Sequence, residues 1–222
     1  MDKFINEPRI HDAALILGCG PSINLLTPEH LKTLQVDTFG INNFCVHEWL
    51  IPNYMQCEVK LEQKEKTDFF INILESKKDL LKKTGFLLPI EDTDKVGQCL
   101  PQELRRLEIP FNGYNPCRPH ATYSFGRLLS VVNGKKYKTI YLLGCDMFSS
   151  EYFWAGRKDL PRFMDFSNAE IDYTADTPHR SASEGIISRI IPYVKKNKIN
   201  VVNLSPISLW KDHLPTKALS DL

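Results

Sequence analysis

The chain has 222 residues, 42% of them hydrophobic and 25% charged, with a formal net charge of +1. This is the composition of a globular protein, and the near-neutral charge argues against a nucleic-acid partner, because a surface that follows phosphates usually leaves a basic excess. No apolar run approaches the roughly 20 residues that span a bilayer, and the first residues lack the apolar core of a signal peptide.

The amino-terminal part predicts a strand, a helix and a second strand. Residues 13–17 (AALIL) form a continuous apolar run, which is typical of a strand buried on both faces. After a tight turn, Thr27 and Pro28 suit the N-cap and the first position of a short helix. The segment 36–42 (VDTFGIN) then predicts the second strand and closes a βαβ unit.

Strands and helices continue to alternate along the chain. Residues 91–121 are rich in proline, glycine and asparagine and predict mostly loop. The alternation predicts an α/β fold with a Rossmann-like, mainly parallel sheet and helices on both faces. The remaining expected strands are 54–61, 86–90, 139–144 and 199–204, and the remaining expected helices are 69–83, 123–133 and 181–197.

Residues 145–180 form a long segment rich in aromatic side chains. Ordered segments of this length are usually binding loops or lids, and a small helical subdomain that packs its own aromatic residues is the alternative. We therefore expect one domain over residues 1–222, with a lid subdomain at about 145–180.

The turn after the first strand is a candidate ligand site. Gly18 and Gly20 let the main chain approach a ligand, and Ser22 adds a hydroxyl at the carboxyl end of the strand, where open α/β sheets hold ligands. The turn is neither GxGxxG nor a P-loop, because the third glycine is missing and Pro21 removes one N–H. Simple packing of the turn is an equally good interpretation of its glycines.

Two asparagines, Asn42 and Asn43, end the second predicted strand. Their amides can hydrogen-bond a ribose, a base edge or a phosphate without adding negative charge. This position fits a nucleotide ligand, although not NAD in particular.

In order and spacing, several short motifs resemble the bacterial CMP-sialic acid glycosyltransferases of glycosyltransferase family 42. The resemblance runs from about Ala14 to Leu209 and is poor between 60 and 110. It rests on G-x-G-P-S after the first strand, INNF at 41–44, IYLLGCD at 140–146, the histidine of HRSASEGIISRII at 179–191, and SPISL at 205–209.

The resemblance implies a variant GT-A fold with a lid, a CMP-activated keto-acid sugar as donor, and neither metal nor cofactor. It implies that Tyr152 assists departure of the CMP phosphate and that His179 is the general base, a role that suits a side chain with a pKa near 6.5. The nucleotide- and donor-binding residues that it implies are Gly20, Pro21, Ser22, Asn42, Arg118, Thr122, Gly144 and Asp146. Gly18 and Asn43 join this set because of their positions after the two predicted strands.

Three positions depart from the family pattern. Phe148 replaces a second lid tyrosine and cannot donate a hydrogen bond, Glu62 falls where the family has a donor-binding asparagine, and Arg118 is offset by about one residue. These departures bear on the identity of the sugar more than on the CMP.

Other residues have competing interpretations. His179 immediately precedes the predicted helix and could simply cap it, and His120 is a candidate second active-site histidine. The D-x-D of Asp92 and Asp94 suits a divalent cation, but a charged stretch of this kind is more often a solvated turn. The lysine-rich stretches 135–138 and 195–198 follow predicted helices and complement their dipoles, with a contact to anionic lipid or polysaccharide as the alternative.

The sequence therefore predicts a cytoplasmic glycosyltransferase that transfers sialic acid, Kdo or a related sugar from a CMP donor to a bacterial lipo-oligosaccharide or capsule glycan. Six scattered cysteines without a CxxC pair favour reduced thiols in the cytoplasm. Peripheral contact with the inner membrane and homo-oligomer formation stay open. The alternatives are a metal-dependent pterin pyrophosphokinase-type enzyme and a nucleotide-binding module without catalysis.

Overall fold

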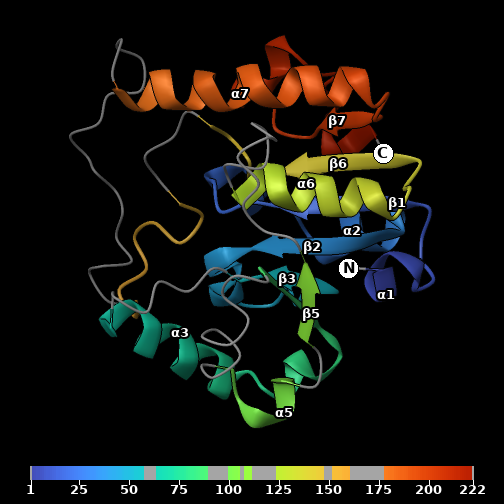
Figure 1. Cartoon of the computed structure of the whole chain (residues 1–222). Helices are drawn as coiled ribbons and strands as arrows, with labels where there is room; N and C mark the ends of the chain where they lie inside the picture. Colours follow the sequence, from blue (N-terminus) through green and yellow to red (C-terminus); the bar gives the residue numbers. More distant parts are fainter. Residues whose placement is uncertain are drawn as a thin grey trace. The chain divides into compact units, whose positions relative to one another are not determined.

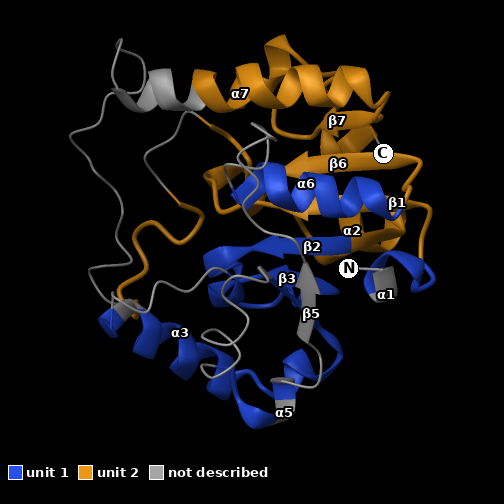
Figure 2. Ribbon diagram, in the orientation of Figure 1, with its two compact units in different colours: residues 1–9, 38–135 blue, residues 10–37, 136–222 orange. Residues whose placement is uncertain are grey.

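Parallel strands and helices alternate in the computed structural model, as the sequence predicts for an α/β protein (Figure 1). The structure describes residues 2–57, 64–89, 100–105, 108–111, 124–147, 152–160 and 178–221. The chain divides into two compact units: unit 1 comprises residues 1–9 and 38–135, and unit 2 comprises residues 10–37 and 136–222 (Figure 2).

Unit 2 contains three parallel strands in the order β1-β6-β7. They are β1 (Ala13–Leu17), β6 (Thr139–Leu143) and β7 (Val201–Asn203). Leu17 pairs with Leu143, so β1 and β6 end side by side. Four of the five β1 residues are buried, as expected of a strand covered on both faces. The helices of unit 2 are α2 (Pro28–Leu34) and α7 (Pro178–Lys196).

Unit 1 contains a second parallel set in the order β5-β4-β3-β2. The strand β2 starts at the end of the first stretch of unit 2 and continues into unit 1. The strands are β2 (Val36–Ile41), β3 (Tyr54–Gln56), β4 (Gly85–Pro89) and β5 (Glu108–Phe111), and the helices are α1 (Asp2–Asn6), α3 (Lys64–Ser76), α5 (Gln102–Arg105) and α6 (Ser124–Gly134).

Most expected elements are confirmed within a few residues, two have wrong bounds, and two short elements were not expected. The helix predicted at 69–83 starts earlier, at Lys64, and ends at Ser76, before a separate 3-10 turn at Leu80–Lys83. The strand predicted at 54–61 ends at Gln56. The segment 91–121, predicted as mostly loop, lies largely outside the described residues, and the described part contains the unexpected α5 and β5. The strand β5 carries Pro110 and lies at an edge of the unit 1 set, where a missing N–H is tolerated.

The domain expectation stays a prediction. Of the expected lid at 145–180, the structure describes 145–147, 152–160 and the start of α7.

A buried carboxyl group joins two loops that precede strands of unit 2. Asp37 is fully buried, and its Oδ2 accepts a hydrogen bond of 2.6 Å from the Tyr137 hydroxyl and one of 3.2 Å from the Ile10 N–H. Tyr137 precedes β6 and Ile10 precedes β1. Asp37 therefore holds together the two loops that lead into the amino ends of β1 and β6.

We predict that Tyr137→Phe lowers the free energy of unfolding by about 1–3 kcal/mol, because a buried acceptor loses its donor. Urea denaturation measures the change. Tyr141→Phe in β6 is the matched control, since its hydroxyl has no hydrogen-bond partner among the described residues. Equal midpoints for the two variants would contradict the role given to Asp37.

Candidate functional site

The turns that follow β1 and β6 are hydrogen-bonded to each other beyond the ends of the strands. The Gly18 N–H donates to the Leu143 carbonyl at 2.8 Å, and the Gly20 N–H donates to the Gly144 carbonyl at 2.7 Å. A 3-10 helix (Pro21–Leu25) follows directly. The carboxyl edge of the unit 2 strands, where α/β proteins hold ligands, is thus built from two joined turns.

Glycine is required at three positions because the two turns pack closely. A Cβ at Gly18 would overlap the Gly144 carbonyl oxygen and lie 2.9 Å from the Cys145 nitrogen, and a Cβ at Gly20 would overlap Asp146 Oδ2. Gly144 has a φ of +71°, in the left-handed region that favours glycine. Packing therefore accounts for these glycines, and their contact with a nucleotide stays a prediction.

Ser22 and Asp146 form a buried polar pair across the two turns. The Ser22 hydroxyl donates to Asp146 Oδ1 at 2.6 Å, and the Ser22 N–H donates to Oδ2 at 3.0 Å. The same hydroxyl accepts from the Gly144 N–H at 2.8 Å. Both side chains are at most 3% exposed. The hydroxyl is engaged inside the protein, so the described geometry makes Ser22 and Asp146 positioning residues for the turn backbone.

The carboxyl-terminal segment supports the β6 turn from another direction. The indole N–H of the fully buried Trp210 donates to the Cys145 carbonyl at 2.8 Å, and the Leu209 N–H donates to the Asp146 carbonyl at 3.2 Å. The sequence prediction used the spacing of SPISL but did not include Trp210. This tryptophan directly follows the motif, so its position could have marked it as a candidate.

Burial raises the pKa of the Cys145 thiol well above its ordinary value, and the Asp146 carboxylate and the Cys19 thiol raise it further. Cys145 is therefore a protonated thiol at neutral pH and a poor nucleophile. Cys145 therefore contributes to the packing of the turn.

Tyr152 lies beside the first turn. The N–H of its neighbour Phe153 donates to the Cys19 carbonyl at 2.9 Å, and the Asn24 side chain donates to the Phe153 carbonyl at 3.3 Å. The Tyr152 ring stacks on the buried Trp154, with 4.6 Å between centroids and 4° between planes. The stacking restricts the orientation of the Tyr152 ring.

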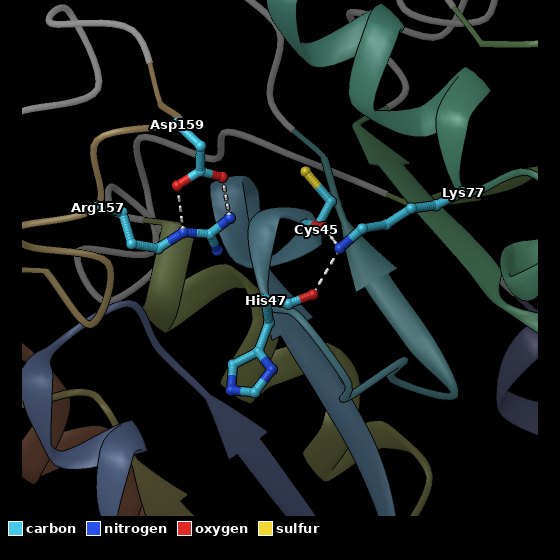
Figure 3. Close-up of polar contacts among 5 residues, drawn as sticks. All are labelled: Cys45, His47, Lys77, Arg157 and Asp159. Carbon is cyan, nitrogen blue, oxygen red and sulfur yellow. Dashed lines mark hydrogen bonds and ion pairs between the residues drawn. The ribbon is translucent and has the colours of Figure 1, made fainter.

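The segment that carries Tyr152 also contains an ion pair. Arg157 and Asp159 form a two-bond ion pair (Figure 3), and the hydrogen bond from Arg157 lowers the pKa of the Asp159 carboxyl group. The pair is exposed and contributes little to stability.

In unit 1, Asn42 and Asn43 begin a 3-10 helix (Asn42–Val46) after β2. Asn42 has a φ of 51°, a conformation that asparagine tolerates. Its Nδ2 donates a long hydrogen bond of 3.5 Å to Ser124 Oγ at the start of α6. Its Oδ1 is buried and has no hydrogen-bond partner among the described residues. An oxygen in that state is suited to a donor from a ligand.

Lys77 holds the other end of this 3-10 helix. Its ammonium group donates to the Cys45 carbonyl at 2.8 Å and to the His47 carbonyl (Figure 3). Burial raises the pKa of the Cys45 thiol to about 12, although the Lys77 charge opposes the shift. The lysine therefore supports the backbone that presents Asn42.

The remaining sequence-predicted residues are only partly described. His179 is the second residue of α7, so the expectation that it precedes the helix is wrong; Pro178 at the first helical position marks the true start. The His179 side chain lies outside what the structure describes. Arg118, Thr122, His120, Phe148, Glu62, Asp92 and Asp94 also lie outside the described residues.

Two further findings concern the described residues. No three His, Cys, Asp or Glu side chains among them gather closely enough to hold a metal ion. None of the described helices combines the length and apolarity needed to cross a membrane.

The chain is similar in fold to solved sialyltransferases from Campylobacter jejuni. CstII in complex with the substrate analogue cytidine-5′-monophosphate aligns with a TM-score of 0.58 and 15% identity, covering 96% of this chain and 87% of CstII. The monofunctional α-2,3-sialyltransferase Cst-I aligns with a TM-score of 0.56 and 15% identity, covering 96% of this chain and 84% of Cst-I. CstII in complex with a trisaccharide acceptor and CMP aligns with a TM-score of 0.54 and 15% identity, covering 92% of this chain and 85% of CstII.

No protein-family model matches the sequence, and no curated protein has a significant sequence match. The fold expected from the resemblance is confirmed by the solved structures.

We predict that Gly20→Ala lowers the free energy of unfolding by about 1–3 kcal/mol, because the added Cβ displaces the Asp146 carboxylate. Gly185→Ala in α7 is the matched control: among the described residues outside its own helix backbone, its Cβ would meet no atom within 4 Å, and alanine stabilises a helix by about 0.5–1 kcal/mol. Urea denaturation compares the two. An unchanged midpoint for Gly20→Ala would contradict the close packing of the turns.

Proposed function

We propose that the protein is a glycosyltransferase that transfers a keto-acid sugar, such as sialic acid or Kdo, from a CMP-activated donor to a bacterial surface glycan. One observation carries the proposal: nearly the whole chain shares its fold with sialyltransferases solved with CMP and, for CstII, with CMP-3FNeuAc. The acceptor is proposed to be a lipo-oligosaccharide or capsule glycan.

The nucleotide is proposed to bind at the carboxyl edge of the unit 2 strands. Gly18, Gly20 and Pro21 would face it from the first turn, and Gly144 from the second, with the buried Ser22–Asp146 pair holding both turns in place. What supports this placement is the position of the joined turns at the ends of β1 and β6.

The sugar is proposed to contact Asn42, Asn43, Arg118 and Thr122. The buried Oδ1 of Asn42 supports the assignment, because a ligand hydroxyl would supply the donor that this oxygen needs. Thr122 precedes α6 by two residues, so a sugar carboxylate there would lie near the positive end of the helix dipole.

The reaction is proposed to be a displacement without a metal ion. The bond from the anomeric carbon to the CMP phosphate breaks with its electron pair going to CMP, and the acceptor oxygen forms the new glycosidic bond. His179 takes the proton from the acceptor hydroxyl, and the Tyr152 hydroxyl donates to the departing phosphate. The stacking of Tyr152 on Trp154 supports its part, because a fixed ring costs less to orient.

A cytoplasmic location is proposed from the thiols. Among the described residues, Cys19, Cys45, Cys57 and Cys145 form no disulfide bond, as is usual for cysteines in reducing compartments.

We predict that CMP and CDP raise the melting temperature more than AMP or GMP do, because a ligand that binds only the folded state stabilises it. Differential scanning fluorimetry with matched nucleotide concentrations measures the shifts. Equal shifts with purine nucleotides would refute the assignment to cytidine.

We predict that His179→Ala lowers the transfer rate by about 10²–10⁴-fold, the usual loss of a general base, and leaves CMP affinity nearly unchanged. The wild-type rate should rise with pH through an apparent pKa near 6.5, and this rise should vanish in the variant. The exposed His213, which follows the 3-10 helix Leu209–Asp212, provides the control variant His213→Ala. Wild-type transfer by His179→Ala would exclude a histidine base at this position.

A further inference from the structure

Exposed lysines gather at the amino ends of β6 and β7, the edge of unit 2 opposite the joined turns. The last turn of α7 carries Lys195 and Lys196, and the loop after it carries Lys198. Lys136 and Lys138 precede β6. Figure 1 shows that α7 ends on the side from which β6 begins.

The two loops are in direct contact. The Ile140 N–H donates to the Asn200 carbonyl at 2.9 Å, and the Asn200 side chain donates to Thr139 Oγ1 at 2.9 Å and to the Lys138 carbonyl at 3.3 Å. The lysines of two distant sequence stretches therefore form one surface. Lys138 pairs with the exposed Asp12, so its charge is partly neutralised.

Positive charge near the carboxyl end of a helix is favourable, and this accounts for Lys195 and Lys196 in the last turn of α7. Lys198 caps the same helix: it has a left-handed φ of 52°, and its N–H donates to the Lys195 carbonyl at 3.2 Å. Lys136, with a φ of 60°, follows the end of α6 by two residues. The helix dipoles therefore favour each lysine separately, but they do not explain why the lysines of two distant sequence stretches share one surface.

An exposed apolar side chain lies beside these lysines. Ile10 is 67% exposed, and its N–H is tied through Asp37 to Tyr137, the residue between Lys136 and Lys138. The Lys138 N–H also donates to the Asp12 carbonyl at 2.8 Å, two residues from Ile10. We call Ile10 together with Lys136, Lys138, Lys195, Lys196 and Lys198 the lysine face.

We propose that the lysine face binds anionic lipid bilayers and holds the protein at a membrane surface. Lysines attract the negative headgroups, and the exposed isoleucine enters the boundary between headgroups and acyl chains, a combination found in proteins that lie on membranes. Ile10 favours a bilayer over a soluble polyanion, because a polyanion gives an apolar side chain nothing to enter. Tyr137, which lies between Lys136 and Lys138 in the sequence, is buried with its hydroxyl on Asp37 and cannot stack on a nucleic-acid base.

The joined turns lie at the opposite ends of the same strands, so a protein bound through the lysine face keeps its carboxyl edge away from the bilayer. Lys135 takes no part in this face: it is buried, and its ammonium group donates to the Phe4 and Glu7 carbonyls of unit 1.

The test is co-sedimentation with vesicles of phosphatidylcholine alone or of phosphatidylcholine and phosphatidylglycerol in equal parts. At about 0.1 M salt, where the Debye length is about 10 Å, the wild type should bind the mixed vesicles and not the neutral ones. Higher salt should release it. Binding to both kinds of vesicle, or to neither, overturns the proposal.

The decisive variant replaces Lys136, Lys195, Lys196 and Lys198 by glutamine. Gln35 already adopts the same left-handed conformation in this chain, so glutamine is tolerated there. Each lysine near an anionic surface contributes about fivefold to binding, so the variant should bind at least about 100-fold more weakly. The control variant replaces the exposed Lys64, Lys82, Lys83 and Lys211 by glutamine. It changes the net charge by the same amount at other places on the surface and should bind like the wild type.

A second variant, Ile10→Ser, separates a bilayer from a soluble polyanion. It should weaken binding to mixed vesicles several-fold and leave unchanged any binding to duplex DNA or an acidic polysaccharide. Far-UV circular dichroism and the urea midpoint verify that each variant is folded. Equal loss in the two quadruple variants, or wild-type vesicle binding by Ile10→Ser, overturns the proposal.

Discussion

The buried contact between Ser22 and Asp146 is the constraint on which the carboxyl edge of unit 2 depends. It joins two turns that are 124 residues apart in sequence and uses both carboxylate oxygens, the serine hydroxyl and two backbone N–H groups. A buried polar group without a partner costs about 1–3 kcal/mol, so the arrangement is stable only when every member is satisfied. The close approach that satisfies them leaves no room for a Cβ at Gly18 or Gly20.

The rest of the site is arranged around this fixed contact. Trp210 and Leu209 hold the carbonyls of the β6 turn, and Phe153 attaches the aromatic segment to the β1 turn. The turns therefore have little freedom to move, which suits a nucleotide site because a preorganised backbone binds a ligand at a smaller entropic cost. The lysine face lies at the other ends of the same strands, so the proposed membrane contact and the proposed nucleotide site would use separate surfaces.

Much of the fold could be predicted from the sequence, because buried apolar runs such as 13–17 and 139–143 are local signals. The edge strand β5 could not, since it is short and contains Pro110. The sequence marked Gly20, Ser22 and Asp146 as one site only through resemblance to a family, since their contact spans 124 residues. Local patterns also could not show that the Ser22 hydroxyl is engaged within the protein, or that Trp210 supports the second turn.

The most direct test of the proposed function is the release of CMP from CMP-sialic acid and CMP-Kdo, measured with and without a glycan acceptor and in the presence of EDTA. The account predicts that at least one donor releases CMP, that an acceptor accelerates the release, and that EDTA leaves the rate unchanged. Binding of CMP without turnover of either donor would contradict transferase activity and favour a nucleotide-binding module. Loss of activity in EDTA would contradict the metal-free mechanism.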